Sequence, residues 1–156
     1  MKILFHDTQG KMPFEQTYVD QAVRFFADTL FGDTCYNNLH LEIALTEPEE
    51  DGCLGETITY DFDEVSTPEF IDITLVKHLS DEDFMTTLAH EMVHVWQLAT
   101  GSLIVDEETL NISWHKFVNH GDDYNDTPWE QEANEYESIL VDKWKHHVEA
   151  AKNQKT

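Results

Sequence analysis

Basic residues are scarce in this chain. Nine Lys and Arg stand against 32 Asp and Glu among 156 residues, which leaves a formal net charge of −23. A surface with so much negative charge repels nucleic acid backbones and acidic membrane surfaces, and it attracts metal cations and basic partners. The composition therefore argues against direct binding to nucleic acids or membranes.

Cysteine is rarer still, since the chain has only Cys35 and Cys53. Two cysteines do not make a disulfide framework, so we expect reduced thiols in a cytoplasmic chain. No apolar run approaches the length of a membrane span, and the start, MKILFHD, is too short for a signal-peptide core. The sequence predicts a soluble, intracellular protein.

The chain shows no internal repeat, low-complexity tract or linker, and its length predicts one domain over residues 1–156. Apolar periodicity, β-branched residues and turn signals indicate the secondary structure. The expected elements are a helix over 14–31, strands over 39–46, 55–62 and 69–76, a helix over 81–99, a short strand over 111–118 and a helix from 128 onward. This order predicts an α+β fold with an N-terminal helix and a sheet of three or more strands.

The helix expected over residues 81–99 contains the pattern H-E-x-x-H, formed by His90, Glu91 and His94. Residues four apart lie on one face of a helix, so both histidines can direct a ring nitrogen to the same ion. Zinc prefers such ligands, and catalytic zinc sites usually combine three protein ligands with a water. Glu91 lies about 100° round the helix, where it can take a proton from the bound water.

The surroundings of the motif favour this interpretation over a chance match. The same helix carries the large apolar residues Phe84, Leu88, Met92, Val95 and Trp96. Two histidines and a glutamate within one turn of a largely buried helix are costly unless a partner such as a metal ion satisfies them. The alternative is a solvated polar face with ordinary histidines.

A third ligand is expected downstream, at His115, His120 or a glutamate of the segment PWEQEANEYE. We favour Glu132, because the final helix starts firmly, with Thr127 as N-cap and Glu130 three residues later. His115 is the alternative, since imidazole is an equally good zinc donor.

Several residues together point to a known family over about positions 80–140. They are His90 to His94, Gln97, Gly101, Trp114, Tyr124, Pro128 to Glu130, and Glu132 with Ala133. This set resembles the small zincin-like metallopeptidases of bacteriophage genomes, which are distantly similar to SprT-like proteins. The resemblance implies a zincin-like peptidase, working in the host cytoplasm if phage-encoded, with its third ligand on the C-terminal helix.

By this resemblance His90, His94 and Glu132 bind zinc and Glu91 is the general base. SprT-like proteins use a histidine as third ligand, which would instead select His115. A zincin-like fold would also place the strand over 69–76 at the sheet edge along the cleft, where a peptide could add as an extra strand; an ordinary internal strand is the alternative. Tyr124 and His115 are candidates for stabilising the oxyanion.

Three functions compete for this sequence. The first is a zinc peptidase, whose acidic cleft would favour basic peptides or proteins. The second is an acidic DNA mimic or inhibitor that binds a basic, nucleic-acid-binding partner, with zinc structural or absent. The third is a zincin scaffold with a structural zinc. Glu91 discriminates among them, because only hydrolysis needs a glutamate beside the first ligand.

Overall fold

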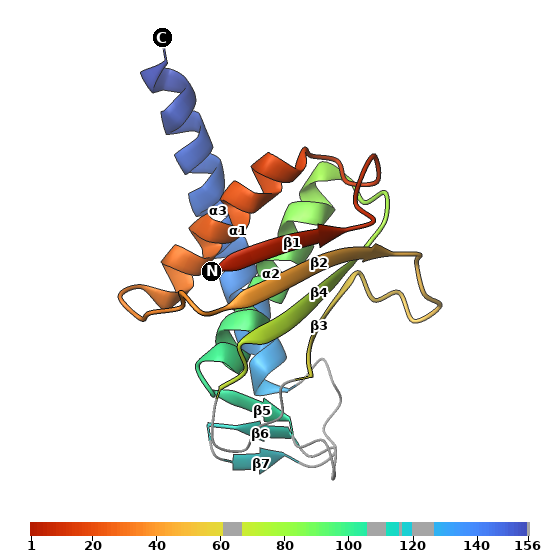
Figure 1. The fold of residues 1–156 in the computed structure, drawn as a ribbon, viewed down its shortest axis with the longest axis vertical. Coiled ribbons are helices and arrows are strands. Elements are labelled where there is room, and N and C mark those ends of the chain that lie inside the picture. The colour runs from red at the N-terminus through yellow and green to blue at the C-terminus, as the bar shows by residue number, and fades with distance from the viewer. Residues whose placement is uncertain (61–66, 106–111, 116, 120–126, 156) are drawn as a thin grey trace.

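Figure 1 shows the computed structural model, which describes residues 1–60, 67–105, 112–115, 117–119 and 127–155. Its elements are, in chain order, β1 (Lys2–His6), α1 (Gln16–Phe31), β2 (His40–Thr46), β3 (Gly55–Thr59), β4 (Phe70–Val76), α2 (Asp81–Ala99), β5 (Leu103–Val105), β6 (Ile112–Trp114), β7 (Phe117–Asn119) and α3 (Pro128–Gln154). This mixture of helices and strands confirms the α+β class expected from the sequence.

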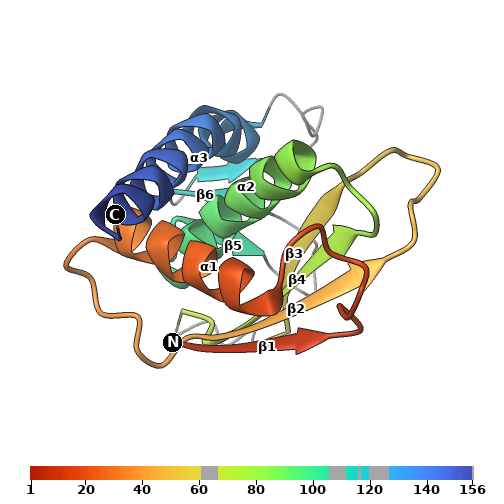
Figure 2. The same ribbon diagram turned by 90° about the horizontal axis from the view of Figure 1, so that it is seen from above.

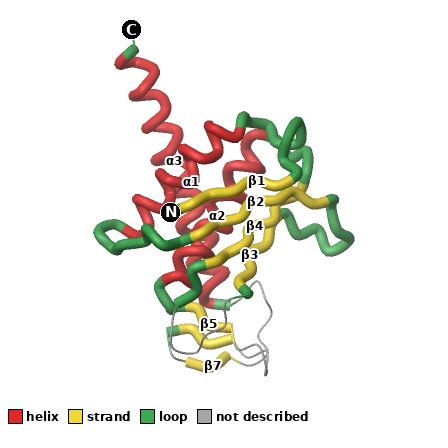
Figure 3. The backbone as a smooth tube through the Cα atoms, viewed as in Figure 1, coloured by secondary structure: helices red, strands yellow, loops and turns green. Residues whose placement is uncertain are grey.

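The larger sheet has four strands in the order β1-β2-β4-β3 (Figure 3). β1, β2 and β4 are parallel, whereas β3 runs antiparallel to β4 and forms an edge. The prediction that residues 69–76 form the sheet edge is therefore wrong, because β4 lies between β2 and β3. The physical reason is burial: Ile71, Ile73 and Leu75 of β4 are 0% exposed, and an internal strand shields such a row better than an edge strand does.

Two further parts of the fold differ from the sequence-based expectation. The first element is a strand, β1, which pairs in parallel with β2. The helix α1 connects the two strands, as a parallel pair requires. In place of the single strand expected over 111–118, the structure has two short strands, β6 and β7, and His115 follows β6 with a left-handed φ of 45°. Together with β5 they make a second, antiparallel sheet. Strands of three residues are too short to show a periodic pattern.

The helix that carries the motif begins as its sequence predicts. The Ser80 hydroxyl accepts a hydrogen bond from the backbone N–H of Asp83 at 3.1 Å and donates one to the Asp83 carboxylate at 2.7 Å. This reciprocal cap satisfies an N–H group that the helix itself cannot pair. α2 ends at Ala99, and Gly101 adopts a left-handed φ of 74° just beyond it. Both boundaries confirm the expected helix.

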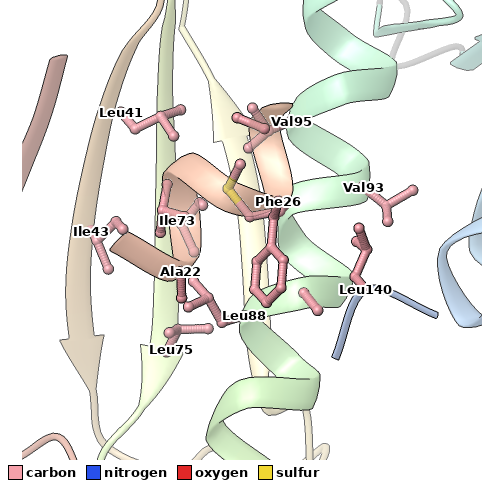
Figure 4. Close-up of a cluster of buried hydrophobic side chains, with 14 of the residues drawn as sticks. Ala22, Phe26, Leu41, Ile43, Ile73, Leu75, Leu88, Val93, Val95 and Leu140 are labelled. Carbon is pink, nitrogen blue, oxygen red and sulfur yellow. The ribbon is translucent and has the colours of Figure 1, made fainter. Parts of the chain in front are cut away.

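All three helices lie on one side of the larger sheet, and α3 packs against α2 and α1 (Figure 2). α2 is central, because it packs against α1, α3, β3, β4 and β5. The core fills the space between these layers (Figure 4), and its fully buried members include Phe26 of α1, Ile43 of β2, Ile73 of β4, Leu88 of α2 and Leu140 of α3. The motif thus lies on the most enclosed helix of the fold.

The two cysteines are free and exposed, and they form no disulfide. The Cys53 thiol donates to the backbone oxygen of Gly55 at 2.8 Å, and burial raises its pKa above the usual value. A raised pKa disfavours the reactive thiolate. None of the helices in the described ranges is both long and apolar enough to cross a membrane.

Candidate metal centre

The two histidines of the motif point toward one another from successive turns of α2. Their Nε2 atoms are 3.1 Å apart, and their rings meet at 76° with centroids 4.8 Å apart. His94 is buried, with 6% of its surface exposed, and His90 is partly buried. The helical spacing thus brings both imidazoles to one point, as the sequence predicted.

Glu130, in the first turn of α3, completes the group. One carboxylate oxygen lies 3.2 Å from Nε2 of His90, and the other lies 3.1 Å from Nε2 of His94. Four-coordinate zinc with bonds of about 2.0–2.1 Å separates its ligand atoms by about 3.3–3.4 Å. Within the described part of the chain, these three residues therefore form a group that could hold a metal ion.

Glu132 does not join this group, so the sequence-based choice of third ligand is replaced by Glu130. The carboxylate of Glu132 accepts a hydrogen bond from Nε2 of Gln97 at 3.0 Å. Residues two positions apart on a helix differ by about 200° around its axis. The rotation of α3 that directs Glu130 at the histidines therefore turns Glu132 away from them. The sequence pattern marks Glu130 as a capping residue, whereas the structure places it in the group that could hold a metal ion.

A signal for Glu130 is nevertheless present in the sequence. The inward side of α3 carries Ala133, Leu140 and Trp144, all of which are buried. Counting in steps of three and four from these residues places Glu130 and Glu137 on the same side, and leaves Glu132 off it. The apolar stripe thus narrows the candidates to Glu130 and Glu137, and only the packing of α3 against α2 brings Glu130 into the metal-ligating group.

Each histidine is held by a further side chain through its other ring nitrogen. Nδ1 of His90 lies 2.8 Å from the carboxylate of Glu137, and Nδ1 of His94 lies 2.8 Å from Oε1 of Gln97. Both partner atoms are acceptors, so each Nδ1 carries the hydrogen. In a neutral imidazole the lone pair is then on Nε2, the nitrogen that faces Glu130. In both rings, the nitrogen that can bind a cation therefore faces Glu130.

The electrostatics of the group also favour a cation. Burial by itself lowers the pKa of His90, but hydrogen bonds to Glu130 and Glu137 and the charge of Glu91 outweigh it and raise the pKa to about 10. A proton on His90 is therefore strongly stabilised by its surroundings. A metal ion at the same point would take the place of that proton and meet the same negative charge.

Glu91 lies beside this group and faces β3. Its carboxylate accepts a hydrogen bond of 2.6 Å from the Thr57 hydroxyl of the edge strand, and only 4% of its surface is exposed. Burial raises the pKa of this carboxyl, opposed mainly by the charge of His94 and by the Thr57 hydrogen bond. A Cβ at Gly55 would stand 2.8 Å from Oε1 of Glu91, so glycine allows β3 to approach this closely.

The remaining sequence-based candidates lie elsewhere. His115 is exposed at the end of β6, where its ring contacts Trp114 at 4.4 Å, and it is not part of the metal-ligating group. His120 and Tyr124 lie outside the described residues. The structure therefore assembles the candidate site from α2, α3 and β3.

Comparisons of the chain with family models, with curated proteins and with solved structures find no match. The resemblance to phage zincin-like proteins stays a prediction. Function is therefore inferred from the geometry of the site: two imidazoles and a carboxylate directed at one point, with a buried carboxylate beside them.

Proposed function

We propose that this chain is a zinc-dependent peptidase. The observation that carries the proposal is the convergence of His90, His94 and Glu130, with Glu91 one residue from the first ligand. Two histidines and one glutamate are a ligand set of catalytic zinc sites in peptidases. A carboxylate next to them, held in place by an edge strand, is what hydrolysis requires in addition.

His90 and His94 would each provide Nε2 to the zinc, and Glu130 would provide a carboxylate oxygen. When bound, zinc lowers the pKa of a water to about 7 and polarises the carbonyl of the scissile bond. Glu91 accepts the proton of the attacking water and delivers it to the leaving amine as the C–N bond breaks. Because burial raises the pKa of Glu91, its carboxylate is a stronger base than an exposed one.

The edge strand β3 offers a place for the substrate. An extended peptide pairs with the outer edge of β3 and gains backbone hydrogen bonds without a strict sequence requirement. Thr57 of this strand contacts Glu91 directly, so a peptide bound there lies close to the general base. In this proposal β3, and not the strand over 69–76, is the edge along which the peptide binds.

The two alternative functions fit the site less well. A DNA mimic works through exposed charge, whereas Glu91 and Glu130 are each 4% exposed and add little to the surface. A structural zinc site is usually closed by four protein ligands. In the described ranges the group has three, which suits a catalytic site with a position for water.

Zinc binding is the first test of the proposal. Protein stripped with a chelator and titrated with zinc is expected to bind about one ion per chain. Because His90 has a pKa of about 10, it is protonated at pH 8, so binding is expected to release about one proton and to weaken as the pH falls. Calorimetry in two buffers with different ionisation enthalpies measures this proton.

The same preparations test hydrolysis. Zinc-loaded protein is expected to cleave an unfolded basic protein, to stop with a chelator and to recover when zinc is added back. If the protein binds no transition metal, the proposed metal centre is wrong. If it binds zinc but cleaves none of a broad set of peptides, the proposed peptidase function is wrong.

Substrate charge gives a second expected result. Lys116 is the only Lys or Arg between His78 and Asp142, the stretch that includes all of α2 and the start of α3. We therefore expect a Lys-rich peptide to be cleaved faster than a Glu-rich peptide of the same length at low salt. The difference should shrink as salt rises, because ions screen the attraction. Equal rates for the two peptides at low salt would exclude this preference.

A further inference from the structure

Gln97 makes an unusual set of contacts for a side chain that is 0% exposed. Its Oε1 lies 2.8 Å from Nδ1 of His94, and its Nε2 lies 3.0 Å from both the backbone oxygen of Trp129 and the carboxylate of Glu132. A buried amide is costly unless its donors and acceptor are paired, and here they are. An apolar side chain such as Met would fill the same space without this requirement, so packing alone does not account for Gln97.

The contacts determine how the amide is oriented. The backbone oxygen of Trp129 and the carboxylate of Glu132 can only accept hydrogen bonds, so the group that faces them must be the NH₂ of Gln97. The amide oxygen then faces His94 and can only accept. Nδ1 of His94 must therefore carry its hydrogen, which leaves the lone pair on Nε2 toward His90 and Glu130.

The same amide also holds the helix that carries Glu130. Trp129 is the residue before Glu130, so the hydrogen bond from Gln97 to its carbonyl fixes the first turn of α3 against α2. One side chain thus contacts a histidine of the metal-ligating group and the backbone beside its carboxylate. Glu132 provides a second acceptor for the NH₂ group of Gln97, which disfavours the flipped orientation of the amide.

We infer that Gln97 is a positioning residue of the metal centre and that Glu132 acts through Gln97 and not on the metal. The inference rests on the metal centre of the proposed function. It assigns Gln97 two tasks, namely selecting the tautomer of His94 and holding the turn of Glu130. Partners of this kind usually contribute about 10–100-fold to metal affinity.

Two substitutions at position 97 separate positioning from packing. Gln97→Met keeps the volume and loses the acceptor, so zinc affinity is expected to fall about 10–100-fold. Thermal stability is expected to fall as well, because the Trp129 carbonyl loses its donor. Gln97→Glu keeps an acceptor for His94 but sets a carboxylate against the Trp129 carbonyl and Glu132. It loses the contact that holds the turn of Glu130 but keeps the acceptor for His94, so it is expected to lose less zinc affinity than Gln97→Met and to unfold at a lower temperature than wild type.

Adding Glu132→Gln to Gln97→Glu tests the role of Glu132. The new amide at position 132 can donate to the carboxylate at position 97, so the double variant is expected to regain thermal stability that the single variant loses. Gln131→Met is the matched control, because it makes the same chemical change at an exposed position of α3. Zinc affinity is measured by competition with a chromophoric chelator.

A measurement without metal keeps the inference separate from the proposed function. In ¹⁵N-histidine-labelled protein without added metal, His94 is expected to carry its hydrogen on Nδ1, and Gln97→Met is expected to mix the two tautomers. If wild type shows this tautomer but binds no zinc, the proposed function fails and the tautomer selection stands. If Gln97→Met binds zinc as wild type does, or if Gln97→Glu loses as much affinity as Gln97→Met, Gln97 is a packing residue and the inference is overturned.

Discussion

Glu91→Gln is expected to abolish peptide hydrolysis while zinc remains bound. An amide cannot accept the proton of the attacking water, and general-base catalysis of this kind contributes roughly 10²–10⁴-fold to the rate. Zinc affinity should change little, because the carboxylate of Glu91 faces Thr57 and not the point where the histidines meet. Bound zinc is measured by elemental analysis, and cleavage by kcat on one fluorogenic peptide.

The fold should tolerate this change. The amide oxygen can still accept the hydrogen bond from Thr57, and a neutral group removes a buried charge, so thermal stability is expected to stay the same or to rise. Glu82→Gln is the matched control, since it makes the same change at an exposed position of α2. A Glu91→Gln protein that retains full activity would rule out the proposed mechanism.

Glu130→Gln and Glu132→Gln are expected to differ strongly, although they make the same change two residues apart. Glu130 meets both histidines with its two oxygens, so loss of its charge should weaken zinc binding by more than about 100-fold, beyond the usual effect of an outer partner. Glu132 contacts Gln97, and an amide oxygen can still accept that hydrogen bond. Its replacement should change zinc affinity only a few-fold.

His115→Ala serves as a third comparison, because His115 was the other candidate ligand and is exposed beside β6. Zinc affinity is measured for the three variants under one buffer and salt condition. If Glu132→Gln or His115→Ala loses zinc while Glu130→Gln keeps it, the ligand set read from the structure is wrong. Unfolding in the absence of metal, followed in parallel, shows whether a loss of zinc reflects a loss of fold.

Much of the fold could be predicted from local patterns. The helices α1 and α2, the strands β2 and β4 and the start of α3 lie where periodicity, caps and turn residues place them. The elements that were missed, β1 and β5, are short or lie at the start of the chain, and the single strand expected over 111–118 corresponds to the two short strands β6 and β7. Such strands exist because neighbouring strands pair with them, and pairing partners are distant in sequence.

The sequence by itself determined the part of the site that one helix contains. A capped helix with histidines four residues apart must bring both to one face, and Glu91 must lie beside them, because the helical period allows no other arrangement. Only the tertiary structure decided which glutamate meets them, which strand forms the edge and what holds His94. These depend on the rotation of α3 against α2 and on the order of the strands, which are set by the packing of buried side chains such as Ala133 and Leu140 on α3 and Ile73 on β4. Packing of this kind sums many weak contacts between distant residues, and no local pattern encodes the sum.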